Sequence, residues 1–126
     1  MTLRLSALPG VYGVFRLHAD APLPDWFALS GELAAVCRTA DELSLLALEK
    51  SVPSEVLGER GLRAFKVGGP LDFTETGIFV AIARFLAEAK IPIFALSTFE
   101  TDYVLVPAVR FDEASQILAA RFDLAG

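Results

Sequence analysis

A group of hydroxyl and carboxylate side chains interrupts an apolar stretch in the second half of the sequence. In the segment 91–106, IPIFALSTFETDYVLV, the apolar run ends at Leu96, and apolar residues resume at Tyr103. A hydroxyl orients a ligand through hydrogen bonds, and a carboxylate pairs with an ammonium or a guanidinium group. Two interpretations stay open, a plain hairpin turn or a ligand site at the end of a sheet. The candidate ligand residues are Ser97, Thr98, Thr101 and Asp102.

A glycine-rich segment upstream offers the complementary chemistry. The segment 68–76, GGPLDFTET, is rich in turn-forming residues and precedes a stretch with helical periodicity. Free N–H groups at a helix start bind a carboxylate through hydrogen bonds and the helix dipole, and glycines let a ligand approach the backbone closely. Turn chemistry with a threonine N-cap is the alternative interpretation. The candidate ligand residues here are Gly68, Gly69, Thr76, Gly77 and Ile78.

Catalytic and metal-binding residues are scarce. Cys37 is the only cysteine, which excludes an intrachain disulfide and a multi-cysteine metal site, and we expect it to be a small buried residue. His18 is the only histidine and is expected to be a polar residue at a strand end. Because a nucleophile needs a base within hydrogen-bond reach, the sequence suggests no catalytic pair. We therefore predict no enzyme activity, no catalytic residue, no metal site and no cofactor.

Charge and hydropathy exclude further classes of protein. A net charge of −5 without a cluster of Lys or Arg argues against nucleic acid as a partner, because phosphate binding needs a basic face. The apolar runs are far shorter than the roughly 20 residues of a membrane span. The N-terminal stretch MTLRLSALPG does not have the pattern of a signal peptide, so we expect a cytoplasmic protein without a membrane partner.

The second half has the order of elements that is typical of a ferredoxin-like fold. Along this half, segments with the apolar periodicity of strands follow segments with the apolar periodicity of helices. The expected elements are a strand at 61–67, a helix at 77–90, strands at 91–97 and 103–106, a helix at 111–121 and a possible last strand at 121–124.

The first half is less regular and is interpreted as a degenerate internal repeat of the second. Its expected elements are strands at 3–8 and 11–17, a short helix at 23–29 and a hairpin at 32–48. When that hairpin is placed over the later one, Cys37 falls over Ser97 and Glu42 falls over Asp102. The predicted halves are residues 1–60 and 61–126.

The segment 68–106 resembles the ACT domains of aspartate kinase regulatory modules, through its loop, its helix that opens at a glycine and its strand that ends in Ser-Thr. The chain as a whole resembles small bacterial tandem-ACT proteins and half of the eukaryotic CASTOR arginine sensor. The resemblance implies an α+β fold with two ferredoxin-like ACT halves packed side by side through antiparallel sheet. It also implies a site between ACT domains that includes the loop, Ser97-Thr98 and Asp102. The ligand would be arginine or another polar amino acid.

The resulting expectation is a non-catalytic regulatory protein that binds an amino acid. The alternative is a structural interaction module that uses the ACT fold only for assembly. The first half lacks the glycine loop and the long helix, so we expect one site per chain. An apolar content of 54%, with Phe79, Val80 and Phe94 outside the regular apolar faces, predicts a homodimer.

Overall fold

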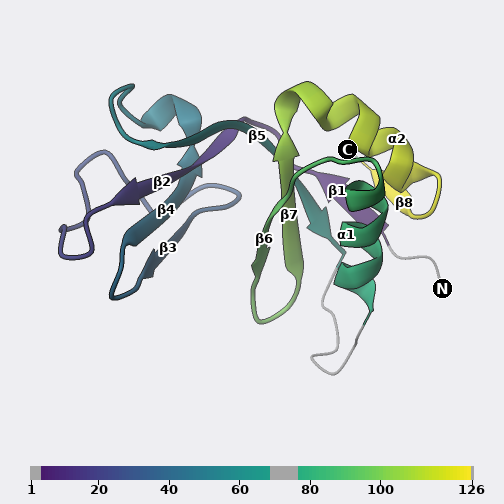
Figure 1. Cartoon of the computed structure of the whole chain (residues 1–126), viewed down its shortest axis with the longest axis horizontal. Helices are drawn as coiled ribbons and strands as arrows, with labels where there is room; N and C mark the ends of the chain where they lie inside the picture. Colours follow the sequence, from purple (N-terminus) through teal and green to yellow (C-terminus); the bar gives the residue numbers. More distant parts are fainter. Residues whose placement is uncertain (1–3, 69–76, 126) are drawn as a thin grey trace. The chain divides into compact units, whose positions relative to one another are not determined.

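The computed structural model describes residues 4–68 and 77–125 of the chain (Figure 1). These residues form two compact units. The N-terminal unit runs from Gly10 to Leu62, and the C-terminal unit combines the residues before Gly10 with those from Arg63 onwards. Strand β5 (Gly58–Val67) begins in the first unit and ends in the second. The strand before Gly10 is thus grouped with the C-terminal unit, although it belongs to the first half of the sequence.

The C-terminal unit is a five-stranded sheet with two helices. Its strands follow the order β8-β1-β5-β7-β6, where β1 pairs antiparallel with β5 and parallel with β8. The expected α+β class and the order of elements are therefore confirmed. The elements are β1 (Arg4–Ala7), α1 (Ile78–Glu88), β6 (Phe94–Ser97), β7 (Asp102–Pro107), the 3₁₀ turn η2 (Ala108–Arg110), α2 (Phe111–Ala119) and β8 (Asp123–Ala125).

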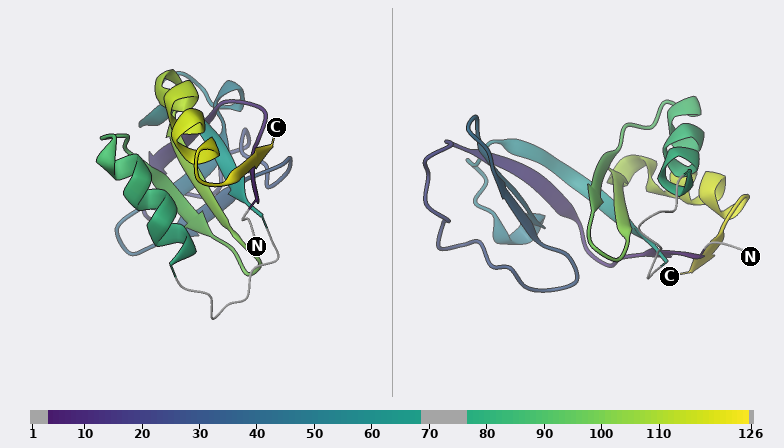
Figure 2. Two further views of the ribbon diagram at one scale, coloured as in Figure 1. Left: turned by 90° about the vertical axis from the view of Figure 1, so that its right-hand side faces the viewer. Right: turned by 90° about the horizontal axis from the view of Figure 1, so that it is seen from below.

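Both helices cover the same face of this sheet (Figures 1 and 2). The apolar residues predicted at helical spacing form the contact, because Ile82 and Leu86 of α1 are buried. Burying side chains of this size stabilises a fold by about 1.5–3 kcal/mol each. The fully buried core consists of Leu5, Phe65, Val67, Ile82, Leu86, Ile91, Val104, Val106, Ala114 and Leu118.

The end of α1 has an unusual residue at its left-handed position. Lys90 has φ 60°, in the region that favours glycine. The N–H of Lys90 donates to the carbonyl of Ala87 at 2.9 Å, and the N–H of Ile91 donates to the carbonyl of Leu86 at 3.0 Å. Arg110 donates two further hydrogen bonds to the carbonyls of Ala89 and Lys90. The last carbonyls of the helix are thereby satisfied, as in a Schellman-type end.

The N-terminal unit is an antiparallel sheet in the order β3-β4-β2-β5. The predicted hairpin at 32–48 is confirmed as β3 and β4. The core lies on one face and includes Phe15, Leu43 and Leu45. The elements are β2 (Tyr12–Leu17), β3 (Ala35–Arg38), β4 (Leu43–Leu48) and the 3₁₀ turn η1 (Glu49–Ser51).

Two expectations for this unit are wrong. The segment 23–29 is a turn and loop rather than a helix, with one bond from the N–H of Phe27 to the carbonyl of Pro24 at 3.1 Å. A helix of seven residues closes only about three i→i−4 bonds, which does not offset the cost of starting a helix. Cys37 is exposed rather than buried: it lies on the edge strand β3 opposite Ser44, on the sheet face opposite the cluster that contains Leu43 and Leu45. His18 follows the end of β2 and is exposed, as expected for a polar residue at a strand end.

Candidate functional site

The polar segment between β6 and β7 forms a tight hairpin turn. The N–H of Thr98 donates to the carbonyl of Thr101 at 2.8 Å, and the Thr98 hydroxyl donates to the same carbonyl at 3.1 Å. The Thr98 hydroxyl also accepts the N–H of Thr101 at 3.3 Å. Only Phe99 and Glu100 remain as loop residues. The Thr98 side chain is therefore occupied by the turn itself.

Thr101 ties this turn to the end of a neighbouring strand. Among the residues that the structure describes, Thr101 is the buried polar residue, with 6% of its surface exposed. Its hydroxyl donates to the carbonyl of Val67, the last residue of β5. A buried carbonyl that loses its donor is costly, so Thr101 positions the hairpin beside the end of β5.

Ser97 and Asp102 face each other across the two strands. They are directly opposite in the β6–β7 register, and the Ser97 hydroxyl donates to Oδ1 of Asp102 at 2.5 Å. Side chains alternate along a strand, so Asp102 shares its face with Val104, which is buried beneath the helices. Oδ2 of Asp102 makes no hydrogen bond within the described residues. A half-buried carboxylate oxygen is thus available on the helix side of the sheet.

The start of α1 has free backbone donors. Gly77 is the N-cap with φ 89°, and none of the described side chains caps the helix. Among the described residues, nothing lies within 4 Å of the position that a Cβ of Gly77 would take. The first turn, which begins with Ile78, contains no acidic side chain to offset the positive end of the helix dipole. This end of α1 therefore favours an anionic group.

These parts lie at one end of the C-terminal unit. Figures 1 and 2 show the tip of the β6–β7 hairpin, the end of β5 and the start of α1 at the same end of the sheet. The chain order gives the same result. After β5 ends, α1 runs away from that end of the sheet and β6 runs back towards it, so the β6–β7 turn lies at the end where β5 stops. The candidate residues Gly69 and Thr76 lie outside the described residues.

Gly68 has a structural reason to be glycine. Its N–H donates to the carbonyl of Arg4 at 2.6 Å, and a Cβ at this position would lie 2.5 Å from the same oxygen. Such a contact is too short for any L-residue with a side chain. The close approach of β1 therefore accounts for Gly68 without a ligand.

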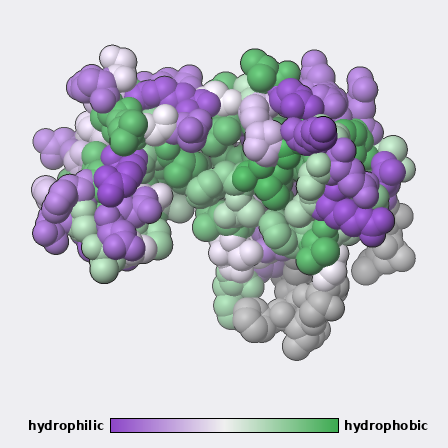
Figure 3. Space-filling model, in the orientation of Figure 1, coloured by the Kyte–Doolittle hydropathy of each residue, from purple (hydrophilic) through white to green (hydrophobic). Residues whose placement is uncertain are grey.

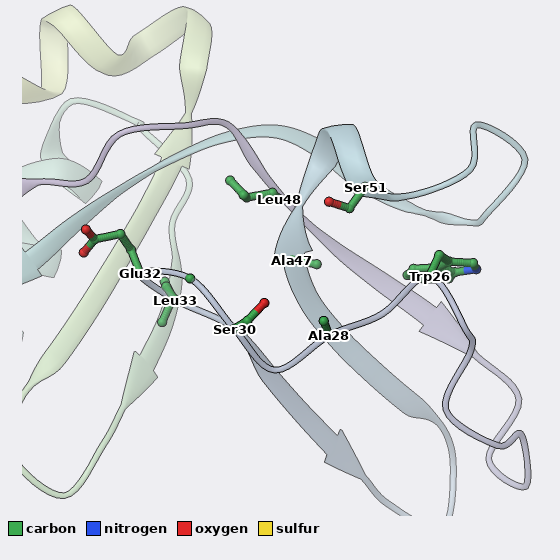
Figure 4. A pocket seen from close by; sticks show the side chains of 10 residues that line it. Trp26, Ala28, Ser30, Glu32, Leu33, Ala47, Leu48 and Ser51 are labelled. Atoms are coloured by element: carbon green, nitrogen blue, oxygen red, sulfur yellow. The ribbon is translucent and has the colours of Figure 1, made fainter.

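A pocket in the N-terminal unit was not foreseen from the sequence. It has a volume of about 70 Å³ and lies between the loop that contains Trp26 and the end of β4 (Figure 4). The hydroxyls of Ser30 and Ser51 point into it, while Glu32 points away. The loop that lines it had been predicted as a helix, so its shape was not visible in the sequence pattern.

The described residues contain no cluster of His, Cys, Asp or Glu that could hold a metal ion. Within residues 4–68 and 77–125, no helix is long and apolar enough to cross a membrane. The ionisable side chains with shifted pKa values lie outside the candidate site. A hydrogen bond from Arg110 to Glu113 at 2.7 Å lowers the pKa of Glu113 and raises the pKa of Arg110.

The family model of the ACT domain matches residues 57–120, just over half of the sequence. The chain belongs to the ACT domain family. A second family model, of an N-terminal domain, matches residues 10–55. The ACT match includes the end of β5, α1 and the β6–β7 hairpin, so the candidate site lies within the matched domain. The resemblance inferred from the sequence is confirmed.

Among known proteins, the chain is similar to subunit 1 of the cytosolic arginine sensor for mTORC1 from Bos taurus. The two are 38% identical over 81 residues, which are 60% of this chain and 24% of the sensor subunit. The chain thus matches a minor part of this relative.

Two solved structures are similar in fold to this chain. A crystal structure of a protein from Agobacterium tumefaciens has a TM-score of 0.90 and 33% identity, and the match covers 100% of this chain and 93% of that one. The aspartate kinase of Clostridium acetobutylicum has a TM-score of 0.66 and 13% identity over 96% of this chain and 34% of the kinase. At that identity the kinase shares the fold alone.

Proposed function

We propose that this chain is a non-catalytic regulatory ACT protein that binds an amino acid at the hairpin end of its C-terminal unit. The observation that supports this most directly is the pairing of two opposite binding features at one end of the unit. The uncapped start of α1 favours a carboxylate, and the free oxygen of Asp102 favours a cation. An amino acid presents both groups on one small molecule.

The proposed ligand is arginine or another polar amino acid. An ammonium or guanidinium group would donate to Oδ2 of Asp102, because Oδ1 already accepts the hydroxyl of Ser97. The arginine-sensing relative supports arginine as the first compound to test. The proposed site residues remain Gly68, Gly69, Thr76, Gly77, Ile78, Ser97, Thr98, Thr101 and Asp102, with Thr98 and Thr101 acting through the shape of the turn.

The proposal also covers the internal repeat, the oligomeric state and the location of the protein. We propose that the two units are degenerate ACT repeats, that the chain forms a homodimer and that it acts in the cytoplasm. The cytosolic relative supports the location. A regulatory role without catalysis is in keeping with the sensor relative and with the ACT family model.

A second candidate function is a structural interaction module whose site holds no ligand. The internal hydrogen bonds favour this alternative, since Ser97 and Thr98 use their hydroxyls within the hairpin and Thr101 donates its hydroxyl to the end of β5. Under this alternative, Asp102 serves only the turn.

A thermal-shift screen of the standard amino acids separates the two functions. A ligand at 100 times its dissociation constant stabilises a protein by about 2.7 kcal/mol, which raises the melting temperature measurably. We expect arginine or another polar amino acid to raise it, and the matching D-amino acid to have a smaller effect. No shift with any standard amino acid would favour the structural module.

A further inference from the structure

The pocket beside Trp26 is enclosed by two parts of the N-terminal unit. One wall is the loop 26–34, and the opposite wall is the end of β4 together with the 3₁₀ turn η1. Both ends of the loop are anchored, because Trp26 packs against the core of this unit and Leu33 is buried. Ala47 of β4 is buried as well. Anchored residues therefore form the pocket before any ligand arrives.

The lining combines apolar side chains with two hydroxyl groups. The hydroxyls of Ser30 and Ser51 point into the pocket, one from each wall (Figure 4). Within the described residues, neither of these hydroxyls makes a hydrogen bond. Each one can therefore donate to a bound molecule and accept from it. The apolar side chains of the lining belong to Trp26, Ala28, Leu33, Ala34, Ala47 and Leu48.

The charges around the pocket favour a neutral ligand. Among the described residues that line it, Glu32 is the charged one, and its carboxylate points away (Figure 4). Figure 3 shows many polar side chains, in purple, on the visible face of the N-terminal unit, so the apolar lining differs from much of the surface of this unit. An ion that entered would lose its hydration without gaining a counter-charge. The pocket therefore disfavours a zwitterionic amino acid.

The volume of the pocket limits the size of the bound group. A cavity of about 150 Å³ holds a benzene molecule. This pocket has about half of that volume, 70 Å³, and so encloses a chain of roughly three carbon atoms. Because Ser30 and Ser51 are exposed, the pocket is open to solvent, and a larger molecule can insert one end.

We propose that this pocket binds a neutral hydroxylated molecule. Hydroxyl groups of the ligand bond to Ser30 and Ser51, and its carbon atoms pack against Trp26, Ala47 and Leu48. The source of this chemistry is either a short polyol, which enters whole, or a sugar, which inserts its hydroxymethyl end. The site lies within the N-terminal unit and does not rest on the proposed amino acid binding.

NMR titration of the intact chain tests the site. Trp26 is the only tryptophan, so its indole N–H gives a single signal at the pocket. The probe is propane-1,2-diol, and the matched ion is lactate, which has the same carbon skeleton with a carboxylate in place of the hydroxymethyl group. We expect saturable shifts of the Trp26 signal and of the Ser30 and Ser51 amides at millimolar diol. Lactate should bind at least about tenfold more weakly.

Removal of the two hydroxyls tests the assigned residues. The double variant Ser30→Ala, Ser51→Ala should bind the diol at least about fivefold more weakly, because two hydrogen bonds are lost. Both serines are exposed, so we expect the variant to fold. Ser54→Ala, at an exposed serine outside the pocket lining, is the matched control and should bind as the parent does.

Methyl glucoside, titrated in the same way, distinguishes the two sources of ligand. Tighter binding than that of the diol assigns the pocket to a sugar, and weaker binding assigns it to a short polyol. The absence of a saturable shift with both neutral compounds would overturn the inference, whatever the outcome of the amino acid screen. Equal binding of lactate and the diol, or an unchanged double variant, would overturn it as well.

Discussion

Thr101 joins the candidate site to the sheet at the scale of a single residue. Its buried hydroxyl donates to the carbonyl of Val67. Thr101→Val keeps the shape of the side chain but leaves that carbonyl without its donor, which should cost about 1–3 kcal/mol of unfolding free energy. Urea unfolding measures the loss. The control is Ser54→Ala, at an exposed serine outside the hairpin, which should stay within about 0.5 kcal/mol of the parent. A Thr101→Val variant as stable as that control would contradict this role.

The pair of Arg110 and Glu113 makes stability depend on pH. The hydrogen bond from Arg110 lowers the pKa of Glu113 in the folded state. A lowered carboxylate pKa contributes stability above the pKa of the unfolded chain, and that contribution disappears as pH falls through the folded pKa. Acidification should therefore destabilise the parent more than a Glu113→Gln variant. Equal pH profiles of the two in denaturant unfolding would contradict the role of this pair.

At the scale of elements, the end of α1 contains backbone strain that a single substitution can relieve. Lys90 occupies the left-handed region, where residues other than glycine are disfavoured by about 1–2 kcal/mol. Lys90→Gly removes that strain but gives the unfolded chain more freedom, so we expect a net gain of about 0.5 kcal/mol. Ala87→Gly, in the last turn of the same helix, should instead lose up to about 1 kcal/mol. Thermal unfolding checks both, and a destabilised Lys90→Gly variant would count against this account of the helix end.

Regular apolar periodicity made the elements of the C-terminal unit predictable. The helices expected at 77–90 and 111–121 are present as α1 and α2, with shorter ends. The hairpin strands also formed where the apolar pattern placed them. The failures came from segments where tertiary contacts decide. Residues 23–29 contain Trp26 and Phe27, which pack against the core from a loop, and Cys37 shares an apolar pattern with its neighbours but lies on an open edge.

The candidate site was only partly readable from the sequence. The sequence identified the polar turn and the glycine before α1, because turn formers and hydroxyl groups are local signals. It did not show that Thr101 is buried or that Ser97 already bonds to Asp102, since both depend on the pairing of strands. The pocket beside Trp26 depends on a loop conformation that no local pattern specifies.

At the scale of the whole molecule, the two units share parts of the chain. The C-terminal unit contains β1, which comes from before Gly10, and β5 runs from one unit into the other. Cleavage between Ser54 and Arg60 therefore separates β1 from its neighbours β5 and β8, and it separates β2 from β5. We predict that neither the fragment before the cut nor residues 61–126 fold stably alone. Cooperative unfolding of the isolated fragment 61–126, with the stability of the intact chain, would contradict this prediction.

Calorimetric titration of the Asp102→Asn variant tests the central claim most directly. The substitution preserves the side-chain shape and removes the charge that the proposed ligand cation needs. We predict that the amino acid identified for the parent binds at least about tenfold more weakly, because a desolvated charge pair is lost. The unfolding free energy should change by less than about 1 kcal/mol. Glu100→Gln, an exposed charge change in the same turn, is the matched control and should bind as the parent does. Unchanged affinity in Asp102→Asn would contradict the site, and a parent that binds no standard amino acid would contradict the function.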